Sequence, residues 1–271
     1  MSPERVISGV QVDYLRSVES PHIPSGAIIP DNCIQTYIPF GSSIVDFGGG
    51  TGKKALHLET LGYRLSVFDV NPHAIATAQH VGISAIEVDV SNTAAVKRVV
   101  NEQHIHPDAV IMEALLCNMV EPKRPQLYLE GLKSAAQILP KGGRILIADV
   151  LATDDVNPVL EQSMKDYELV KLRELWNKRY INNEHIGLPR HVFIVAKPGW
   201  LKELMEYGPT SDLWELLRRN EVERFARHFT NADLEQGLAS VGFRQVSWEY
   251  AIWQSRSGRP LSGCVIVGEK E

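Results

Sequence analysis

Cysteine is scarce in this sequence, and its spacing argues against two common uses. The 271 residues contain three cysteines, an odd number, far apart at Cys33, Cys117 and Cys264. No CxxC pair and no Cys/His spacing of the kind that ligates zinc is present. A disulfide-stapled secreted domain is therefore disfavoured, and we expect reduced, mostly buried thiols in a cytosolic protein.

Long hydrophobic runs are also missing. The charge-free stretch from Asn71 to Ile86 contains Pro72 and His73 and is shorter than the roughly 18 apolar residues that cross a membrane. No apolar run follows the charges of the N-terminal residues Met1–Val6, so we expect no secretory signal. These absences predict a soluble, cytoplasmic protein without a membrane partner.

Positive charge is in deficit. Lys and Arg number 28 against 33 Asp and Glu, which gives a formal charge of −5, so the chain has no overall positive field for a polyphosphate. This disfavours nucleic acid as a partner and favours a small molecule. Hydrophobic residues make up 44% and charged residues 23%, an ordinary globular balance, and the length suits one large domain or a domain with an insert.

Short apolar runs alternate with helical segments through the first half of the chain. Asn71 followed by Pro72 is a typical helix start, and Leu127–Leu139 has helical apolar spacing that ends at Pro140. The alternation predicts βαβ units around a parallel sheet whose strands are covered by helices on both faces. The five expected strands are Ser43–Phe47, Arg64–Val70, Ser84–Val90, Ala109–Ala114 and Arg144–Val150.

The end of the chain predicts a different arrangement. A capping box over Thr230–Asp233 opens a helix, and Gly242 with Phe243 is typical of its left-handed C-terminal cap. Two β-rich runs follow, Arg244–Trp253 and Leu261–Val267, which we expect to pair as an antiparallel hairpin. With the five earlier strands, this hairpin completes an α/β fold with a seven-stranded, mostly parallel sheet.

Nearly eighty residues separate the fifth strand from this ending. Val159–Tyr180 and Leu201–Asn220 show amphipathic helical spacing, so we expect residues 151–228 to form a helical insert that binds substrate over one end of the sheet. Residues 1–42 form a leader that we expect to act as a lid. Residues 43–150 and 229–271 form the sheet domain itself.

A glycine-rich loop carries the most functional information. Asp46–Gly52, DFGGGTG, ends the first strand and opens a helix, so a ligand could approach its backbone and the free N–H groups of the helix start. A P-loop is disfavoured, since Phe47 stands where glycine is needed and Lys54 where serine or threonine is needed. A dinucleotide site stays open, because Gly50–Ala55 satisfies G-x-G-x-x-G/A and Asp69 could hold a ribose diol. A tight turn without any ligand is the plain structural alternative.

Several segments together resemble class I S-adenosylmethionine-dependent methyltransferases. Asp46–Gly52 is similar to the first motif of that family, an acidic residue followed by G-x-G-x-G. The acidic residue before the glycines, the forty-residue leader and the closing hairpin argue against a dinucleotide site. The resemblance implies a Rossmann-like fold with S-adenosylmethionine as cofactor. Further similar segments are Phe68–Asn71, Glu87–Val90, Pro140–Ile147 and Phe229–Phe243.

The resemblance also implies roles for individual residues. Asp69 would hold both ribose hydroxyls, Asp89 would accept from the adenine amine, and Glu113 would lie beneath the reacting sulfur. The residues themselves leave alternatives open, because Asp89 could cap the following helix and Glu113 could be a solvated or paired loop carboxylate. The full set of expected cofactor-binding residues is Asp46, Phe47, Gly48, Gly50, Gly52, Asp69, Val70, Asp89, Val90, Glu113, Ala114 and Leu115.

The implied reaction is in-line transfer of a methyl group to oxygen, nitrogen or carbon of a small molecule. The segment after the fourth strand lacks the Asn/Asp-Pro-Pro-Tyr/Phe motif of nitrogen-methylating relatives, and we expect no catalytic metal. A general base is needed only if the acceptor carries a proton, and it would come from the insert. The candidates are Tyr180, His185 and His191, for which surface exposure or core packing is the plain alternative.

The sequence leaves two other activities open. Some relatives of this family transfer or cyclise the aminocarboxypropyl arm of the same cofactor and release methylthioadenosine. An NAD-dependent oxidoreductase is the second alternative, on the strength of the glycine pattern alone. The sequence leaves a homodimer open.

Overall fold

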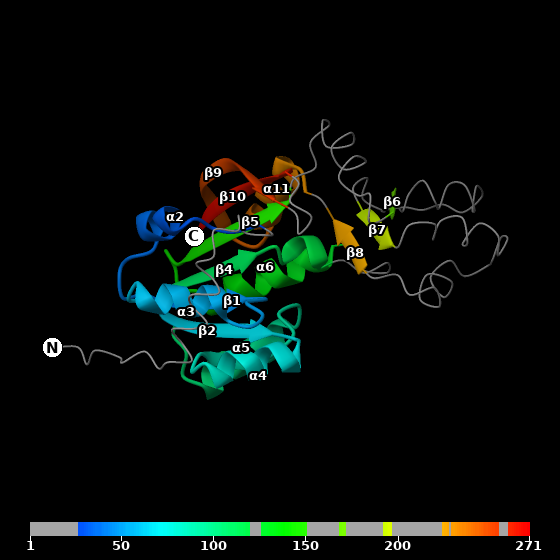
Figure 1. The fold of residues 1–271 in the computed structure, drawn as a ribbon. Coiled ribbons are helices and arrows are strands. Elements are labelled where there is room, and N and C mark those ends of the chain that lie inside the picture. Colours follow the sequence, from blue (N-terminus) through cyan, green and yellow to red (C-terminus); the bar gives the residue numbers. More distant parts are fainter. Residues whose placement is uncertain are drawn as a thin grey trace.

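The computed structural model describes residues 27–119, 126–150, 168–171, 192–196, 224–227, 229–254 and 260–271. These residues form a large mixed sheet with helices on both faces and a small three-stranded sheet to one side of it (Figure 1). The large sheet carries all of the strands that the sequence predicted.

Seven strands make up the large sheet, in the order β3-β2-β1-β4-β5-β10-β9. Strands β1 to β5 are parallel, whereas β10 runs antiparallel to both β5 and β9. The predicted parallel sheet with a closing hairpin is therefore confirmed, although β2, β3 and β4 end one to three residues earlier than expected. The strands are β1 Ser43–Phe47, β2 Arg64–Asp69, β3 Ser84–Glu87, β4 Ala109–Glu113, β5 Arg144–Val150, β9 Phe243–Gln254 and β10 Pro260–Lys270.

Helices bury their apolar sides against both faces of this sheet. Successive strand residues point to opposite faces, so Ile44 joins the core under α2, α3 and α4, while Val45 joins the core under α5, α6 and α11. A single turn of 3-10 helix, η1 (Leu116–Asn118), follows β4. The helices are α2 Asp31–Tyr37, α3 Lys53–Thr60, α4 Pro72–His80, α5 Thr93–Glu102, α6 Leu127–Ile138 and α11 Asn231–Ser240.

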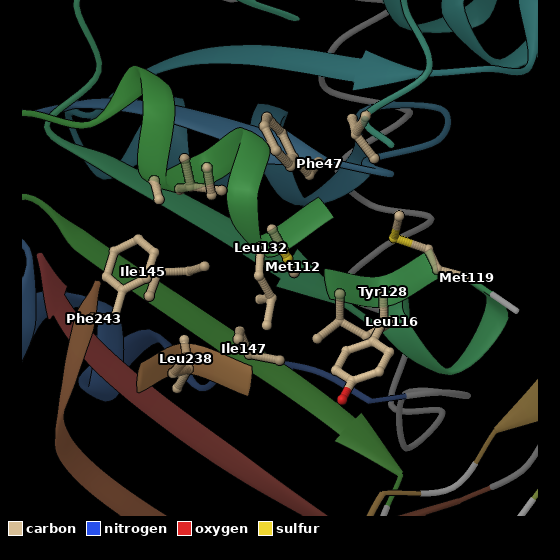
Figure 2. Close-up of a cluster of buried hydrophobic side chains, with 14 of the residues drawn as sticks. Phe47, Met112, Leu116, Met119, Tyr128, Leu132, Ile145, Ile147, Leu238 and Phe243 are labelled. Carbon is tan, nitrogen blue, oxygen red and sulfur yellow. The ribbon is translucent and has the colours of Figure 1, made fainter. Parts of the chain in front are cut away.

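The core on the α6 side is tightly packed. Figure 2 shows Met112 and Ile147 of the sheet together with Leu132 of α6 and Leu238 of α11, and all four side chains are fully buried. A Cβ atom at Gly237 would lie 3.2 Å from Leu132 Cδ1, so glycine at this position lets α11 approach α6 closely. This packing holds the last helix on the sheet next to the closing hairpin.

The predicted helix starts and stops have their physical basis in the structure. Asn71 Oδ1 accepts from the backbone N–H of His73 at 3.0 Å, which caps α4. Thr230 and Asp233 form the expected reciprocal capping box at the start of α11. Gly242 follows α11 with φ +89°, the left-handed conformation that glycine adopts without strain. These local expectations are confirmed.

The insert differs from the prediction of a helical segment. Its described residues are three antiparallel strands, β6 (Glu168–Lys171), β7 (Val192–Ala196) and β8 (Arg224–Arg227), in the order β6-β7-β8. The helix expected over Val159–Tyr180 is therefore wrong at β6, where pairing with β7 decides the conformation. The remainder of that range and Leu201–Asn220 lie outside the described residues. Strand β8 contacts η1, which brings β8 to the carboxyl end of β4.

The three cysteines behave as expected. Cys33, Cys117 and Cys264 are buried, and none of the three forms a disulfide. Burial raises the pKa of Cys33 to about 11 and that of Cys264 to about 12, so both are thiols at neutral pH. Within the described segments, no helix combines the length and the apolar character needed to cross a membrane.

Candidate functional site

Acidic residues gather where the parallel strands end. Asp46 and Asp69 lie on neighbouring strands β1 and β2, Glu113 ends β4, and Asp89 follows β3. Parallel strands place their carboxyl ends at one edge of the sheet, where open α/β folds bind ligands. The structure therefore brings together the four carboxylates that the sequence singled out.

The glycine loop depends on backbone conformations that glycine adopts most easily. Gly48 has φ +72° and donates its N–H to the carbonyl of Phe68 at 2.7 Å, which ties the loop to the end of β2. Gly52 has φ +75° and is the N-cap of α3. A Cβ atom at Gly48 would lie 2.7 Å from Leu115 Cδ1, so the loop also closes against the segment after β4. The side chain of Phe47 is fully buried in the core and stacks on Phe68, so Phe47 contributes only backbone to this surface.

Gly50 and Asp69 form the part of the site that best suits a ligand. Gly50 has φ +55°, and no atom lies within 4 Å of the position that its Cβ would take. Its N–H donates to Asp69 Oδ2 at 2.9 Å, and the N–H of Asn71 donates to Asp69 Oδ1 at 2.8 Å. A carboxylate offers about four lone-pair directions. Asp69 is thus oriented by two backbone donors and keeps acceptor capacity for two hydroxyl groups.

Asp46 lies beneath the loop. Its side chain is buried, and a Cβ atom at Gly49 would lie 2.5 Å from Asp46 Oδ2. Burial, with further contributions from the charges of Glu113 and Asp69, raises the pKa of Asp46 well above its usual value, and Lys54 opposes this shift. Asp46 was expected among the cofactor-binding residues, and the structure places its side chain against the backbone of the glycine loop.

Asp89 and two valines complete the row of expected residues. Asp89 is exposed and accepts from both the N–H and the hydroxyl of Ser91 through Oδ1. The side chain of Asn92, and not that of Asp89, caps α5, so the capping alternative for Asp89 is wrong. Val70 beside Asp69 is 61% exposed and presents apolar surface, whereas Val90 is buried in the core.

Glu113 is already engaged within the protein. Its Oε1 accepts the backbone N–H of Ile29 at 2.8 Å and lies 3.6 Å from Lys54 Nζ. Burial raises the pKa of Glu113, and the charge of Lys54 and the bond from Ile29 oppose the shift. The sequence-based alternative of a paired loop carboxylate fits these contacts.

Ala114 and Leu115 turn the chain after β4. Ala114 has φ +50°, which is uncommon for a residue with a Cβ, and its carbonyl accepts from the side chain of Asn118 at 2.7 Å. Asp149, which sequence reasoning missed, is fully buried near the end of β5 and accepts the N–H of Cys117 at 3.1 Å. The sequence signal that could have identified Asp149 was an acidic residue inside an otherwise apolar strand.

The expected catalytic residues Tyr180, His185 and His191 lie outside the described residues. Among the residues that the structure does describe, no group of three or more His, Cys, Asp and Glu side chains is placed to hold a metal ion.

The strand order also bears on the dinucleotide alternative. A dinucleotide-binding sheet of the usual type has the order 3-2-1-4-5-6, whereas this sheet inserts antiparallel β10 between β5 and β9.

Comparison with known proteins gives a consistent result. Residues 31–247 match the family model described as methyltransferase domain. A solved S-adenosylmethionine-dependent methyltransferase from Methanosarcina mazei is similar over 90% of this chain and 98% of its own, with 19% identity and a TM-score of 0.57. The 1,6-didemethyltoxoflavin-N1-methyltransferase of Burkholderia thailandensis is similar over 88% of this chain and 75% of its own, with 14% identity and a TM-score of 0.50. At these identities the two structures show a shared fold. No curated protein matches the sequence.

Proposed function

The chain belongs to the methyltransferase-domain family, and on that premise we propose that it binds S-adenosylmethionine at the carboxyl ends of β1 to β4 and methylates a small molecule. The observation that carries the cofactor assignment is the pairing of Gly50 with Asp69. A carboxylate with spare acceptor capacity stands there beside a glycine whose missing side chain leaves open space.

The described residues suit the parts of this cofactor. Asp69 would accept the ribose hydroxyls, Asp89 would accept the adenine amine, and the exposed apolar surface of Val70 would cover one side of the adenine. Gly48 and Gly52 keep the loop in the conformation that presents Gly50. When bound, S-adenosylmethionine supplies a methyl group made electrophilic by its sulfonium charge.

The protein's own contribution is to orient the cofactor and the acceptor and to exclude water from them. Asp69 and Asp89, which are not buried, favour a cationic ligand at this edge of the sheet, because the negative potentials of neighbouring charges add up. Ala114 and Leu115 form the turn against which the glycine loop closes. In-line displacement then depends mainly on holding acceptor and donor in line.

The acceptor site is proposed to lie between this turn and the insert. This placement is supported by β8, which contacts η1 beyond the carboxyl end of β4. Tyr180, His185 and His191 remain the candidates for a general base. The formal charge of −5 supports a small-molecule acceptor over nucleic acid. The Burkholderia enzyme of the same fold is a small-molecule methyltransferase with bound 1,6-didemethyltoxoflavin.

The test is product analysis by mass spectrometry. The purified full-length protein is incubated with S-adenosylmethionine alone and then with pools of candidate small-molecule acceptors. We expect S-adenosylhomocysteine to accumulate only with an acceptor, and Asp69→Ala to lower its rate of formation. Methylthioadenosine formed without an acceptor would instead indicate use of the aminocarboxypropyl arm. Calorimetric binding of NAD in place of S-adenosylhomocysteine would contradict the cofactor assignment.

A further inference from the structure

Residues 27–31, called the strap below, are held at the carboxyl end of the sheet by two other elements. The N–H of Ile29 donates to Glu113 Oε1 at 2.8 Å, and Lys54 Nζ donates to the carbonyl of Ile29 at 2.7 Å. The side chain of Ile29 is fully buried. Both backbone polar groups of one strap residue are thus bound by side chains 84 and 25 positions further along the chain.

A set of charges reinforces this attachment. Lys54 Nζ lies 3.2 Å from Asp31 Oδ1 and 3.6 Å from Glu113 Oε1, and His57 Nε2 lies 2.5 Å from Asp31 Oδ2. The side chains of Lys54 and Glu113 are 14% and 17% exposed. Their pairing is therefore screened by solvent less than an ion pair on the open surface would be. His57 on α3 belongs to the same set of charges through its contact with Asp31.

Both anchors of the strap stand next to residues of the proposed cofactor site. Lys54 stands in the first turn of α3, directly after the glycine loop that ends at Gly52. Glu113 precedes Ala114 and Leu115, and Leu115 is the residue against which Gly48 closes. A displacement of the strap would therefore release charged side chains on both sides of the loop.

We propose that Lys54 and Glu113 are positioning residues that hold the strap as one wall of the cofactor site, so that strap attachment and cofactor binding stabilise each other. The claim that strap attachment and cofactor binding stabilise each other rests on the proposed function, whereas the claim that Lys54 and Glu113 hold the strap does not. In this proposal Glu113 acts through Ile29 and not by direct contact with the cofactor beneath the sulfur. Because coupling between two sites is reciprocal, release of the strap should weaken cofactor binding, and bound cofactor should slow release of the strap.

The first measurement is hydrogen exchange of the Ile29 amide in the ligand-free, full-length protein. We expect Glu113→Ala to speed this exchange about tenfold or more, since a hydrogen bond to a charged group is lost. Glu113→Gln keeps an oxygen acceptor and should give a smaller increase, and Lys54→Met should also give an increase. The matched control is Lys133→Met, which removes an exposed lysine paired with Glu130 at 3.7 Å and should leave the exchange of Ile29 unchanged.

Exchange of Val45 in the central strand β1 distinguishes release of the strap from unfolding, and it should stay at the wild-type rate in every variant. The second measurement is the dissociation rate of S-adenosylhomocysteine, which should rise in Glu113→Ala and Lys54→Met and not in Lys133→Met. Weaker binding in Glu113→Ala with unchanged exchange of Ile29 would make Glu113 a direct ligand and overturn the proposal. Faster exchange in a protein whose wild type does not bind S-adenosylhomocysteine would support the attachment and overturn both the coupling and the proposed function.

Discussion

Replacing Gly50 by alanine separates the cofactor role of the glycine loop from its role in folding. Gly50 has φ +55° and open space at its Cβ position, so alanine would meet strain but no clash. The left-handed conformation costs a residue with a Cβ about 1–2 kcal/mol. Reduced freedom of the unfolded chain offsets about 0.4–1 kcal/mol of this. We therefore expect Gly50→Ala to lower the free energy of unfolding by about 1 kcal/mol.

Gly142 provides a matched control. It has φ +80°, it too has no atom within 4 Å of its Cβ position, and it lies in the turn before β5, at the opposite edge of the sheet. Gly142→Ala should thus cost a similar free energy of unfolding. In calorimetric titration, Gly142→Ala should bind S-adenosylhomocysteine with the affinity of the wild type. In Gly50→Ala the new methyl group occupies ligand space, and affinity should fall at least about tenfold, or 1.4 kcal/mol. Equal affinities in the two variants would refute the placement of the cofactor at this loop.

Other predictions concern the buried carboxylate, the adenine contact and a helix cap. Because the pKa of Asp46 is raised, its contribution to stability is full below the unfolded value of about 3.9 and is lost as pH rises through the folded value. Thermal unfolding of Asp46→Asn should therefore show a stability gain over wild type that grows with rising pH, and a pH-independent difference would argue against an ionisable Asp46. In titrations, Asp89→Ala should lower the affinity for S-adenosylhomocysteine about tenfold, because one charge-assisted hydrogen bond to the adenine amine is lost. Its affinity for the inosine analogue, which lacks that amino group, should stay as in the wild type. Thr230→Ala should cost about 1 kcal/mol in denaturant unfolding without changing ligand affinity.

Most of the large sheet could be predicted because its signals are local. Ser43–Phe47 and Arg144–Val150 are short apolar runs, and the structure has strands with the same bounds. The ends of other strands were less predictable, since apolar Val90 continues the pattern of β3 after the strand has ended. Ala114 leaves β4 with a positive φ that no side-chain pattern indicates.

The insert and the strap show where local signals fail. The run Val192–Ala196, VFIVA, is rich in β-branched and aromatic residues and could have been recognised as a strand. By contrast, Glu168–Lys171 has no clear strand signal, and its pairing with β7 decides its conformation. The contact of Glu113 with Ile29 joins residues 84 positions apart, so only the folded chain shows it.

The binding role of Asp69 is the central claim, and its two backbone bonds make a single substitution ambiguous. Asp69→Ala removes the acceptor for Gly50 and for Asn71 as well as the proposed acceptor for ribose. A cycle that varies both protein and ligand isolates the ribose contact.

The most direct measurement is therefore calorimetric titration of wild type and Asp69→Ala with S-adenosylhomocysteine and with an analogue that lacks both ribose hydroxyls. We predict that loss of the hydroxyls weakens binding to the wild type about tenfold or more, as expected for charge-assisted hydrogen bonds, and hardly changes binding to Asp69→Ala. The same loss of affinity in both proteins would show that Asp69 does not hold the ribose and would contradict the cofactor site described above.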